Sequence, residues 1–168
     1  MNEKQLISPK ISEEEAQKRV EQAVDNFMQG YNCSQSVVAA FADLYGFTRE
    51  QALRMSASFG GGIGRMRQTC GAACGMFMLA GLDCGATEGA DRAGKSHNYA
   101  VVQQLADRFK QQTGTIICAE LLGLKKPEGS PEAEARTTQY YKKRPCPHMI
   151  RLGAELFAAY LLEQQNAN

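Results

Sequence analysis

A repeated helix signal is the feature that most limits how this chain can fold. Segment after segment begins with a side chain suited to capping a helix, continues with apolar residues three or four positions apart, and ends near a glycine. No segment shows the alternation of polar and apolar residues that is typical of a half-buried strand. The pattern predicts an all-α fold, an irregular single-domain bundle of about six or seven helices.

The same signals give approximate boundaries for the helices. Ser12, Asn32 and Thr48 each precede a glutamate or glutamine by three residues, which is the spacing of a capping box. Four of the five residues at 60–64 are glycine, and such a run favours a loop over a helix. The expected helices cover 13–29, 33–45, 49–59, 70–82, 91–112, 116–122 and 145–160, with a further short helix at 132–142.

The length and charge of the chain narrow its organisation and its partners. Its 168 residues can bury one sizeable core but are too few for two ordinary domains and a linker, so we expect an N-terminal extension at 1–12 and one helical domain at 13–165. No apolar run approaches the length of a membrane span. Nineteen basic residues against eighteen acidic ones give a net charge of +1, which predicts no nucleic-acid and no membrane partner. The first ten residues lack the apolar core of a secretory signal, so a cytoplasmic location is expected.

Six cysteines are the most informative part of the composition, because the chain has no tryptophan and only two histidines. They are Cys33, Cys70, Cys74, Cys84, Cys118 and Cys146. In a reducing compartment, cysteine serves as a metal ligand, as a redox group, or as a small buried apolar residue. The functional question is which of these three roles the cysteines have.

Four of the six cysteines fall in the first turn of a predicted helix, namely Cys33, Cys70, Cys118 and Cys146. The backbone N–H groups of a first turn lack intrahelical partners and the helix dipole is positive there, so a thiol at this place loses its proton more readily. Thiolate is the form that binds metals and attacks disulfides. If the four helix starts converge, the four cysteines form one site. The same periodicity also fits four separate residues in an apolar core.

The cysteine-bearing segments resemble those of a known family. The segment at 70–75, CGAACG, fits a CGAxxG core, with one isolated cysteine before it and two more after it. The order and spacing of these cysteines, together with the glycine-rich stretch before the core, resemble those of the C_GCAxxG_C_C family of redox-active proteins. The resemblance covers about 16–162. The resemblance implies a largely helical protein with four characteristic redox-active cysteines, which here are Cys33, Cys70, Cys118 and Cys146. It assigns no role to Cys74 or Cys84.

Two chemistries fit four such cysteines. One is ligation of zinc or of an iron–sulfur cluster by all four thiolates, although the separations of 37, 48 and 28 residues lack the close CxxC pairs of common sites. The other is electron transfer or thiol–disulfide exchange, in which one thiolate attacks and a second thiol resolves the product. For that reaction Cys70 is the preferred nucleophile, because a capping Thr69 precedes it and Arg65 and Arg67 lie just upstream.

An alternative from another class is a helical interaction module whose cysteines only fill the core. Other polar residues add little to the choice. His148, two positions after the last cysteine, is a minor candidate for a metal ligand or proton acceptor. Arg136 and the basic residues at 142–144 form a charged stretch of a kind that is usually solvated.

The sequence therefore predicts a redox-active protein, a component of an oxidoreductase system, with the four first-turn cysteines as its site. The cofactor question stays open between an iron–sulfur cluster, a metal ion and reversible disulfides. The expected partner is a redox protein, and a helical surface of this size is compatible with a homodimer.

Overall fold

The structure is a computed structural model that describes residues 8–126 and 129–167, and within these ranges the chain forms helices and no strand. The predicted all-α fold is therefore confirmed. Two 3-10 turns, at Ala42–Tyr45 and Ala57–Phe59, extend the second and third predicted helices. The α-helices are α1 (Glu13–Met28), α2 (Cys33–Ala39), α3 (Arg49–Ser56), α4 (Gly60–Ile63), α5 (Gly71–Cys84), α6 (Arg92–Thr113), α7 (Cys118–Leu121), α8 (Thr138–Lys143) and α9 (Cys146–Ala167).

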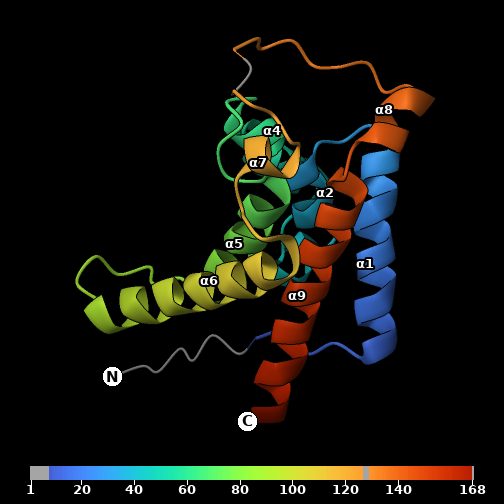
Figure 1. The fold of residues 1–168 in the computed structure, drawn as a ribbon. Coiled ribbons are helices and arrows are strands. Elements are labelled where there is room, and N and C mark those ends of the chain that lie inside the picture. Colours follow the sequence, from blue (N-terminus) through green and yellow to red (C-terminus); the bar gives the residue numbers. More distant parts are fainter. Residues whose placement is uncertain (1–7, 127–128, 168) are drawn as a thin grey trace.

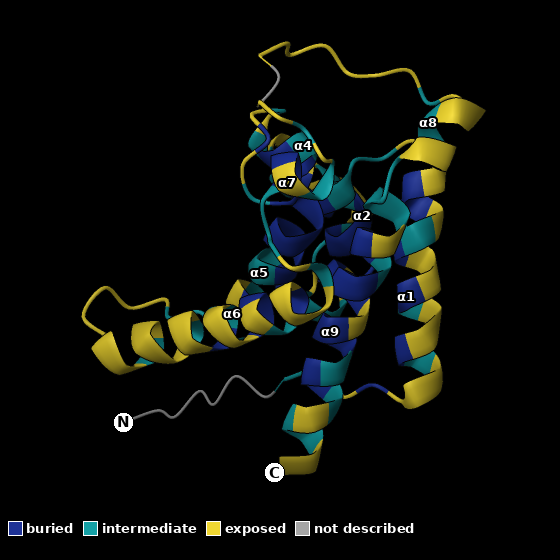
Figure 2. Cartoon of the chain, in the orientation of Figure 1, coloured by how far each residue is buried: buried dark blue, intermediate teal, exposed yellow. Residues whose placement is uncertain are grey.

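Helix α5 lies at the centre of the bundle (Figure 1). Helices α2 and α9 pack against it, α1 packs against α2 and α9, and α6 contacts α5 and α9. Small residues make this packing close: a Cβ atom at Gly75 would lie 3.0 Å from the Cβ atom of Val37 in α2. Figure 2 shows buried residues where α2, α5 and α9 meet, whereas the outer part of α6 is exposed. The core is thus built around α5, and Met76 of that helix is completely buried.

Most of the predicted helix ends agree with the structure. Ser12 caps α1, and the capping boxes at Asn32 and Thr48 are both complete. Asp91 caps α6, and Gly114 ends that helix in the left-handed conformation. These ends depend on side chains that bond within three residues along the chain, which is why the sequence is sufficient to locate them.

Several predicted helices are shorter in the structure, and two of them differ most from the prediction. The chain leaves the α-helical path after Ala39 and continues as a 3-10 turn, which lets Phe41 pack edge-on against Phe157 of α9 with 5.3 Å between ring centroids. The helix expected at 132–142 begins only at Thr138. The residues before it form an extended segment whose side chains contact the rest of the protein.

The glycine-rich stretch at 60–64 forms a compact turn. Gly61 and Gly62 have φ values of 67° and 72°, so α4 is not a regular helix. Three residues that follow share this left-handed conformation although they carry side chains: Ile63, Arg65 and Arg67. Each costs about 1 kcal/mol relative to an unstrained backbone, so the turn is held in place by its contacts.

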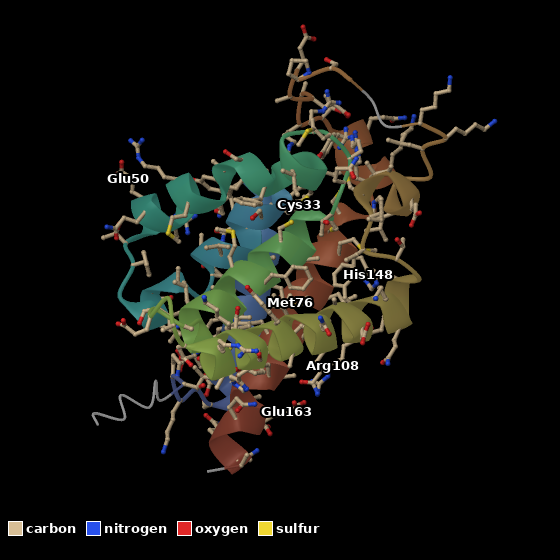
Figure 3. The ribbon with its side chains drawn as sticks, turned by 90° about the vertical axis from the view of Figure 1, so that its left-hand side faces the viewer. Cys33, Glu50, Met76, Arg108, His148 and Glu163 are labelled. Atoms are coloured by element: carbon tan, nitrogen blue, oxygen red, sulfur yellow. The ribbon has the colours of Figure 1, made fainter. Side chains whose placement is uncertain are left out.

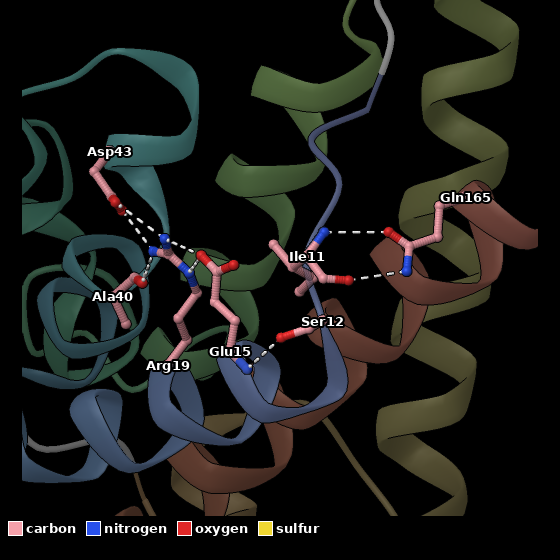
Figure 4. A network of polar contacts seen from close by, with 7 residues as sticks. All are labelled: Ile11, Ser12, Glu15, Arg19, Ala40, Asp43 and Gln165. Atoms are coloured by element: carbon pink, nitrogen blue, oxygen red, sulfur yellow. Dashed lines mark hydrogen bonds and ion pairs between the residues drawn. The ribbon is translucent and has the colours of Figure 1, made fainter.

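Residues before α1 are fastened to the far end of α9. The backbone N–H of Ile11 donates to Gln165 Oε1 at 3.1 Å, and Gln165 Nε2 donates to the carbonyl oxygen of Ile11 at 2.9 Å (Figure 4). Residues 1–7 of the extension expected at 1–12 lie outside the described residues. Within the described chain, no helix combines the length and the apolar character of a membrane-spanning segment.

Ion pairs join helices at the surface of the bundle. Arg19 of α1 contacts Glu15 one turn earlier and Asp43 in the 3-10 turn (Figure 4). Arg108 of α6 pairs with Glu163 of α9 at 2.9 Å (Figure 3). These partly exposed pairs each contribute about 1 kcal/mol or less, so the buried core supplies most of the stability.

Candidate functional site

The four first-turn cysteines line a single cavity of about 280 Å³. It lies at the end of the bundle that is uppermost in Figure 1, where α4 and α7 meet the first turns of α2 and α9. Cys33, Cys118 and Cys146 are the first residues of α2, α7 and α9, and Cys70 is the N-cap residue of α5. All six cysteines of the chain are free thiols. Figure 3 shows Cys33 at the start of its helix.

Backbone hydrogen bonds hold the starts of α5 and α7 side by side. Thr69 and Ile117 form an isolated antiparallel bridge. On either side of it, the N–H of Cys70 donates to the carbonyl oxygen of Ile116 at 2.7 Å, and the N–H of Cys118 donates to that of Gln68 at 2.6 Å. Cys70 and Cys118, which are far apart in the sequence, are thereby fixed on two adjacent backbone segments.

A close approach of backbone brings Cys33 to the same cavity. A Cβ atom at Gly71, the first residue of α5, would lie 3.0 Å from the Cβ atom of Cys33 and 2.9 Å from the carbonyl oxygen of Phe59. Only glycine leaves room for α2 and α5 to start so near one another. The glycine that follows Cys70 in the core motif therefore has a direct role in shaping the cavity.

Cys33 and Cys146 both line the cavity, and a hydrogen bond from the Cys33 thiol to the thiolate of Cys146 separates the acidities of the two groups. The bond from Cys33 stabilises the thiolate of Cys146 and, with the charges of Arg144, Arg136 and Arg67, lowers the pKa of Cys146 to about 7 against the opposing effect of burial. The same bond, together with burial, raises the pKa of Cys33 well above its ordinary value. Cys146 is thus the more acidic thiol of the two.

The other two thiols of the cavity are weaker acids. Burial raises the pKa of Cys70 to about 12, although backbone hydrogen bonds at Ala73 and Ala72 oppose the change. Burial also raises the pKa of Cys118, against the effect of Arg67, whose Nη1 atom lies 3.9 Å from Cys118 Sγ. The guanidinium of Arg67 thus lies beside Cys118, whereas the sequence suggested a role for it at Cys70.

Arginine is the most frequent charged residue of the cavity. Four arginines line it, and Glu134 is the only acidic residue among the described lining residues. Two of the arginines, Arg136 and Arg144, belong to the basic stretch that the sequence suggested was solvated, and both are half-buried. No local pattern connects Glu134 with the cysteines, because it comes to the cavity from an extended segment where a helix was expected.

The remaining candidates lie outside the lining of the cavity. Cys74 Sγ contacts the carbonyl oxygen of Thr69 at 3.7 Å, and burial raises its pKa to about 11. Cys84, at the other end of α5, accepts a hydrogen bond from Asn98 Nδ2 at 3.4 Å. His148 is exposed on α9 (Figure 3). None of the three is positioned to take part in chemistry inside the cavity.

The positions of the possible ligand side chains can be compared with those that a metal site requires. In the described ranges, no group of three or more histidine, cysteine, aspartate or glutamate side chains is placed to hold a metal ion. The four thiols are distributed around a cavity. The four-cysteine metal site that the sequence suggested therefore stays a prediction.

Comparison with known proteins gives one match. The model of a family described as "Putative redox-active protein (C_GCAxxG_C_C)" matches residues 31–160, which is more than half of the chain. The matched range contains every residue that lines the cavity. No curated protein and no solved structure matches the chain.

Proposed function

The chain belongs to the C_GCAxxG_C_C family of redox-active proteins, and we propose that it catalyses thiol–disulfide exchange with Cys146 as the nucleophile and Cys33 as the resolving cysteine. The observation that carries this proposal is that Cys33 and Cys146 line the same cavity and that the pKa values of their thiols are shifted in opposite directions. Such a pair combines a thiolate that is ready to attack with a protonated thiol beside it.

The reaction has two steps. The thiolate of Cys146 attacks a disulfide, RS–SR, forming a mixed disulfide and releasing RS⁻, which takes up a proton. Cys33 then loses its proton and attacks Cys146 Sγ, forming the Cys33–Cys146 disulfide and releasing the second RS⁻. Two protein thiols are oxidised, one substrate disulfide is reduced to two thiols, and two electrons are transferred. A redox partner or a small thiol regenerates the protein by the reverse reaction.

Cys146 is favoured over Cys70 as the nucleophile for two reasons. It is the first residue of a helix of 22 residues, so its sulfur is near the positive end of the helix dipole. Its thiol is also half-buried, whereas Cys70 is only 5% exposed. Cys70 and Cys118 then complete the wall of the cavity as protonated thiols.

A direct test is to oxidise the protein with a small disulfide and map the products by mass spectrometry. We expect a Cys33–Cys146 disulfide as the main intramolecular product. In Cys33→Ala the mixed disulfide on Cys146 should accumulate, because the resolving thiol is missing. Cys74→Ala is the matched control and should behave like the unaltered protein. Oxidation that leaves Cys33 and Cys146 reduced while other cysteines react contradicts the proposal.

The acidity of Cys146 provides an independent test. Removing the hydrogen bond in Cys33→Ala should raise the pKa of Cys146 and make it an acid about tenfold weaker or more, because a hydrogen bond to a charged group is lost. Cys33→Ser supplies a hydroxyl donor and should retain most of the effect. The ultraviolet absorbance of the thiolate, followed against pH, measures the difference. Equal midpoints in both variants would show that the hydrogen bond does not set this pKa.

Ligation of an iron–sulfur cluster is the second candidate, and the observation that favours it is the cavity lined by four thiols. Protein purified without oxygen should then contain iron and acid-labile sulfide, and its four cavity thiols should resist alkylation. A protein without either element that rapidly forms the Cys33–Cys146 disulfide supports thiol exchange. Slow and uniform alkylation of all six thiols would instead support the interaction module with structural cysteines.

A further inference from the structure

An extended segment passes over the cysteine cavity. Residues 129–137, here called the strap, have no regular secondary structure and run between α7 and α8 (Figure 1). Pro131, Ala133, Glu134 and Arg136 of the strap all line the cavity. The strap is therefore part of the wall that separates the cysteines from solvent.

The carboxylate of Glu134 is bound by three arginines from two segments of the chain. Its Oε1 atom accepts a hydrogen bond from Arg65 Nη2 at 3.0 Å and contacts Arg144 Nη2. Arg67 Nη2 lies 3.7 Å from the same oxygen. The three guanidinium-bearing side chains are 17%, 16% and 5% exposed, in that order. Together they form a half-buried receptor for one carboxylate.

The backbone is strained at two of the three arginines of the receptor. Arg65 and Arg67 have φ values of 61° and 59°, in the left-handed region that residues with side chains rarely adopt. Both follow the glycine turn α4, which directs them toward the cavity. Strain of this kind is concentrated at binding and catalytic sites, where it fixes side chains in place.

The receptor also lies beside the thiols of the cavity. Arg67 Nη1 lies 3.9 Å from Cys118 Sγ. The charges of Arg144 and Arg67 favour the thiolate of Cys146. A carboxylate bound in place of Glu134 would therefore lie in the same cavity as the nucleophile.

Apolar and aromatic contacts hold the strap at its α8 end. The guanidinium of Arg136 lies 4.4 Å from the ring centroid of Phe27 and 4.8 Å from that of Tyr140, and it donates to the carbonyl oxygen of Tyr31 at 3.0 Å. Residues 129–135 are all exposed. The carbonyl oxygen of Ser130 accepts a hydrogen bond from Arg65 Nη1 at 2.9 Å. Moving this part of the strap away therefore uncovers little apolar surface, but it breaks this bond as well as the contacts of Glu134.

We propose that Glu134 occupies the place of a substrate carboxylate, and that the cavity accepts a small disulfide whose carboxylate replaces Glu134 on Arg65, Arg67 and Arg144. This inference rests on the thiol–disulfide function proposed above and specifies its substrate class. A cavity of about 280 Å³ suits a small molecule and not a folded partner. The thiolate of Cys146 attacks one sulfur of that disulfide, Cys33 resolves the mixed disulfide, and two molecules of the carboxylate-bearing thiol are released.

The test compares two disulfides of similar size as oxidants of the reduced protein. Dithiodiglycolate has a carboxylate at each end, and hydroxyethyl disulfide is neutral. The quantity compared is the rate of oxidation by dithiodiglycolate divided by the rate of oxidation by hydroxyethyl disulfide. Without a receptor, the negative charges of dithiodiglycolate slow the attack of a thiolate, so a ratio above one indicates that its carboxylate is recognised. We expect Glu134→Gln to increase this ratio about tenfold, because the internal competitor loses its charge, and Arg65→Gln to decrease it by a similar factor.

Glu132→Gln is the matched control, since it removes the same charge from the same strap and its side chain does not line the cavity. It should leave the ratio unaltered. If both disulfides oxidise Cys33 and Cys146 but Glu134→Gln and Arg65→Gln leave the ratio as it was, the carboxylate receptor is wrong and thiol exchange stands. If neither disulfide oxidises the pair, both proposals are wrong.

Discussion

Cys146 is expected to react with iodoacetamide at pH 7 about a hundredfold faster than Cys70 or Cys74, and Cys146→Ser should abolish this fast reaction. With its pKa lowered to about 7, Cys146 is roughly half ionised at that pH. Cys74, with a pKa of about 11, is ionised in about one molecule in 10⁴. Cys70, with a pKa of about 12, is ionised in about one in 10⁵.

The expected factor is smaller than these fractions suggest, because a thiolate of lower pKa is a weaker nucleophile. With a Brønsted coefficient of about 0.4–0.5, the difference of four to five pKa units makes the thiolates of the weaker acids about 40 to 300 times more nucleophilic. The remaining advantage of Cys146 is about a hundredfold. Burial adds to it, since the side chains of Cys70 and Cys74 are only 5% and 8% exposed.

Site-resolved alkylation followed by mass spectrometry measures these rates in one sample. The rate at Cys146 should rise with pH through about 7 and then level off, because the thiolate population saturates above the pKa. Cys74→Ser should leave the fast reaction in place. Alkylation of Cys70 before Cys146 would restore Cys70 as the nucleophile, as the sequence alone suggested.

The sequence was sufficient where structure depends on near neighbours. The caps at Ser12, Asn32 and Thr48 use side chains that bond within three residues, and all three were predicted correctly. The position of the cysteines at helix starts follows from the same local signals. The break of the second helix at Phe41 depends on Phe157 in another helix, and no local pattern reports such a contact.

The same distinction between local signals and long-range contacts applies to the site. Residue type and spacing identified the four cysteines, but the thiol pairing depends on how α2 and α9 meet. The assignment of Arg67 to Cys70 followed from closeness in sequence, whereas the bridge between Thr69 and Ile117 places Cys118 beside that arginine. Glu134 was missed, because its role depends on arginines that converge only in the folded chain.

Replacing Gly62 by alanine should lower the free energy of unfolding by about 3–4 kcal/mol, because the turn α4 has no room for a side chain there. Gly62 has a φ of 72°, and its added Cβ atom would lie 2.5 Å from Cys118 Cβ and 2.8 Å from both Arg67 Cα and Gln68 N. Two of these three atoms are backbone, so they cannot move aside without disrupting the bridge that holds Cys118. Loss of stability and displacement of a cavity thiol are thus expected together.

Gly64→Ala is the matched control, because it introduces backbone strain without crowding. Gly64 also has a positive φ, 59°, but its nearest neighbour to an added Cβ atom is the carbonyl oxygen of Ser58 at 3.9 Å. Alanine there should cost only about 1 kcal/mol, as is usual for a left-handed residue. Urea denaturation of both variants measures the difference, and alkylation of Cys118 should become faster in Gly62→Ala alone. If the two variants lose equal stability, backbone strain alone accounts for the effect at Gly62. The turn then does not pack against the cysteine cavity as closely as these contacts require.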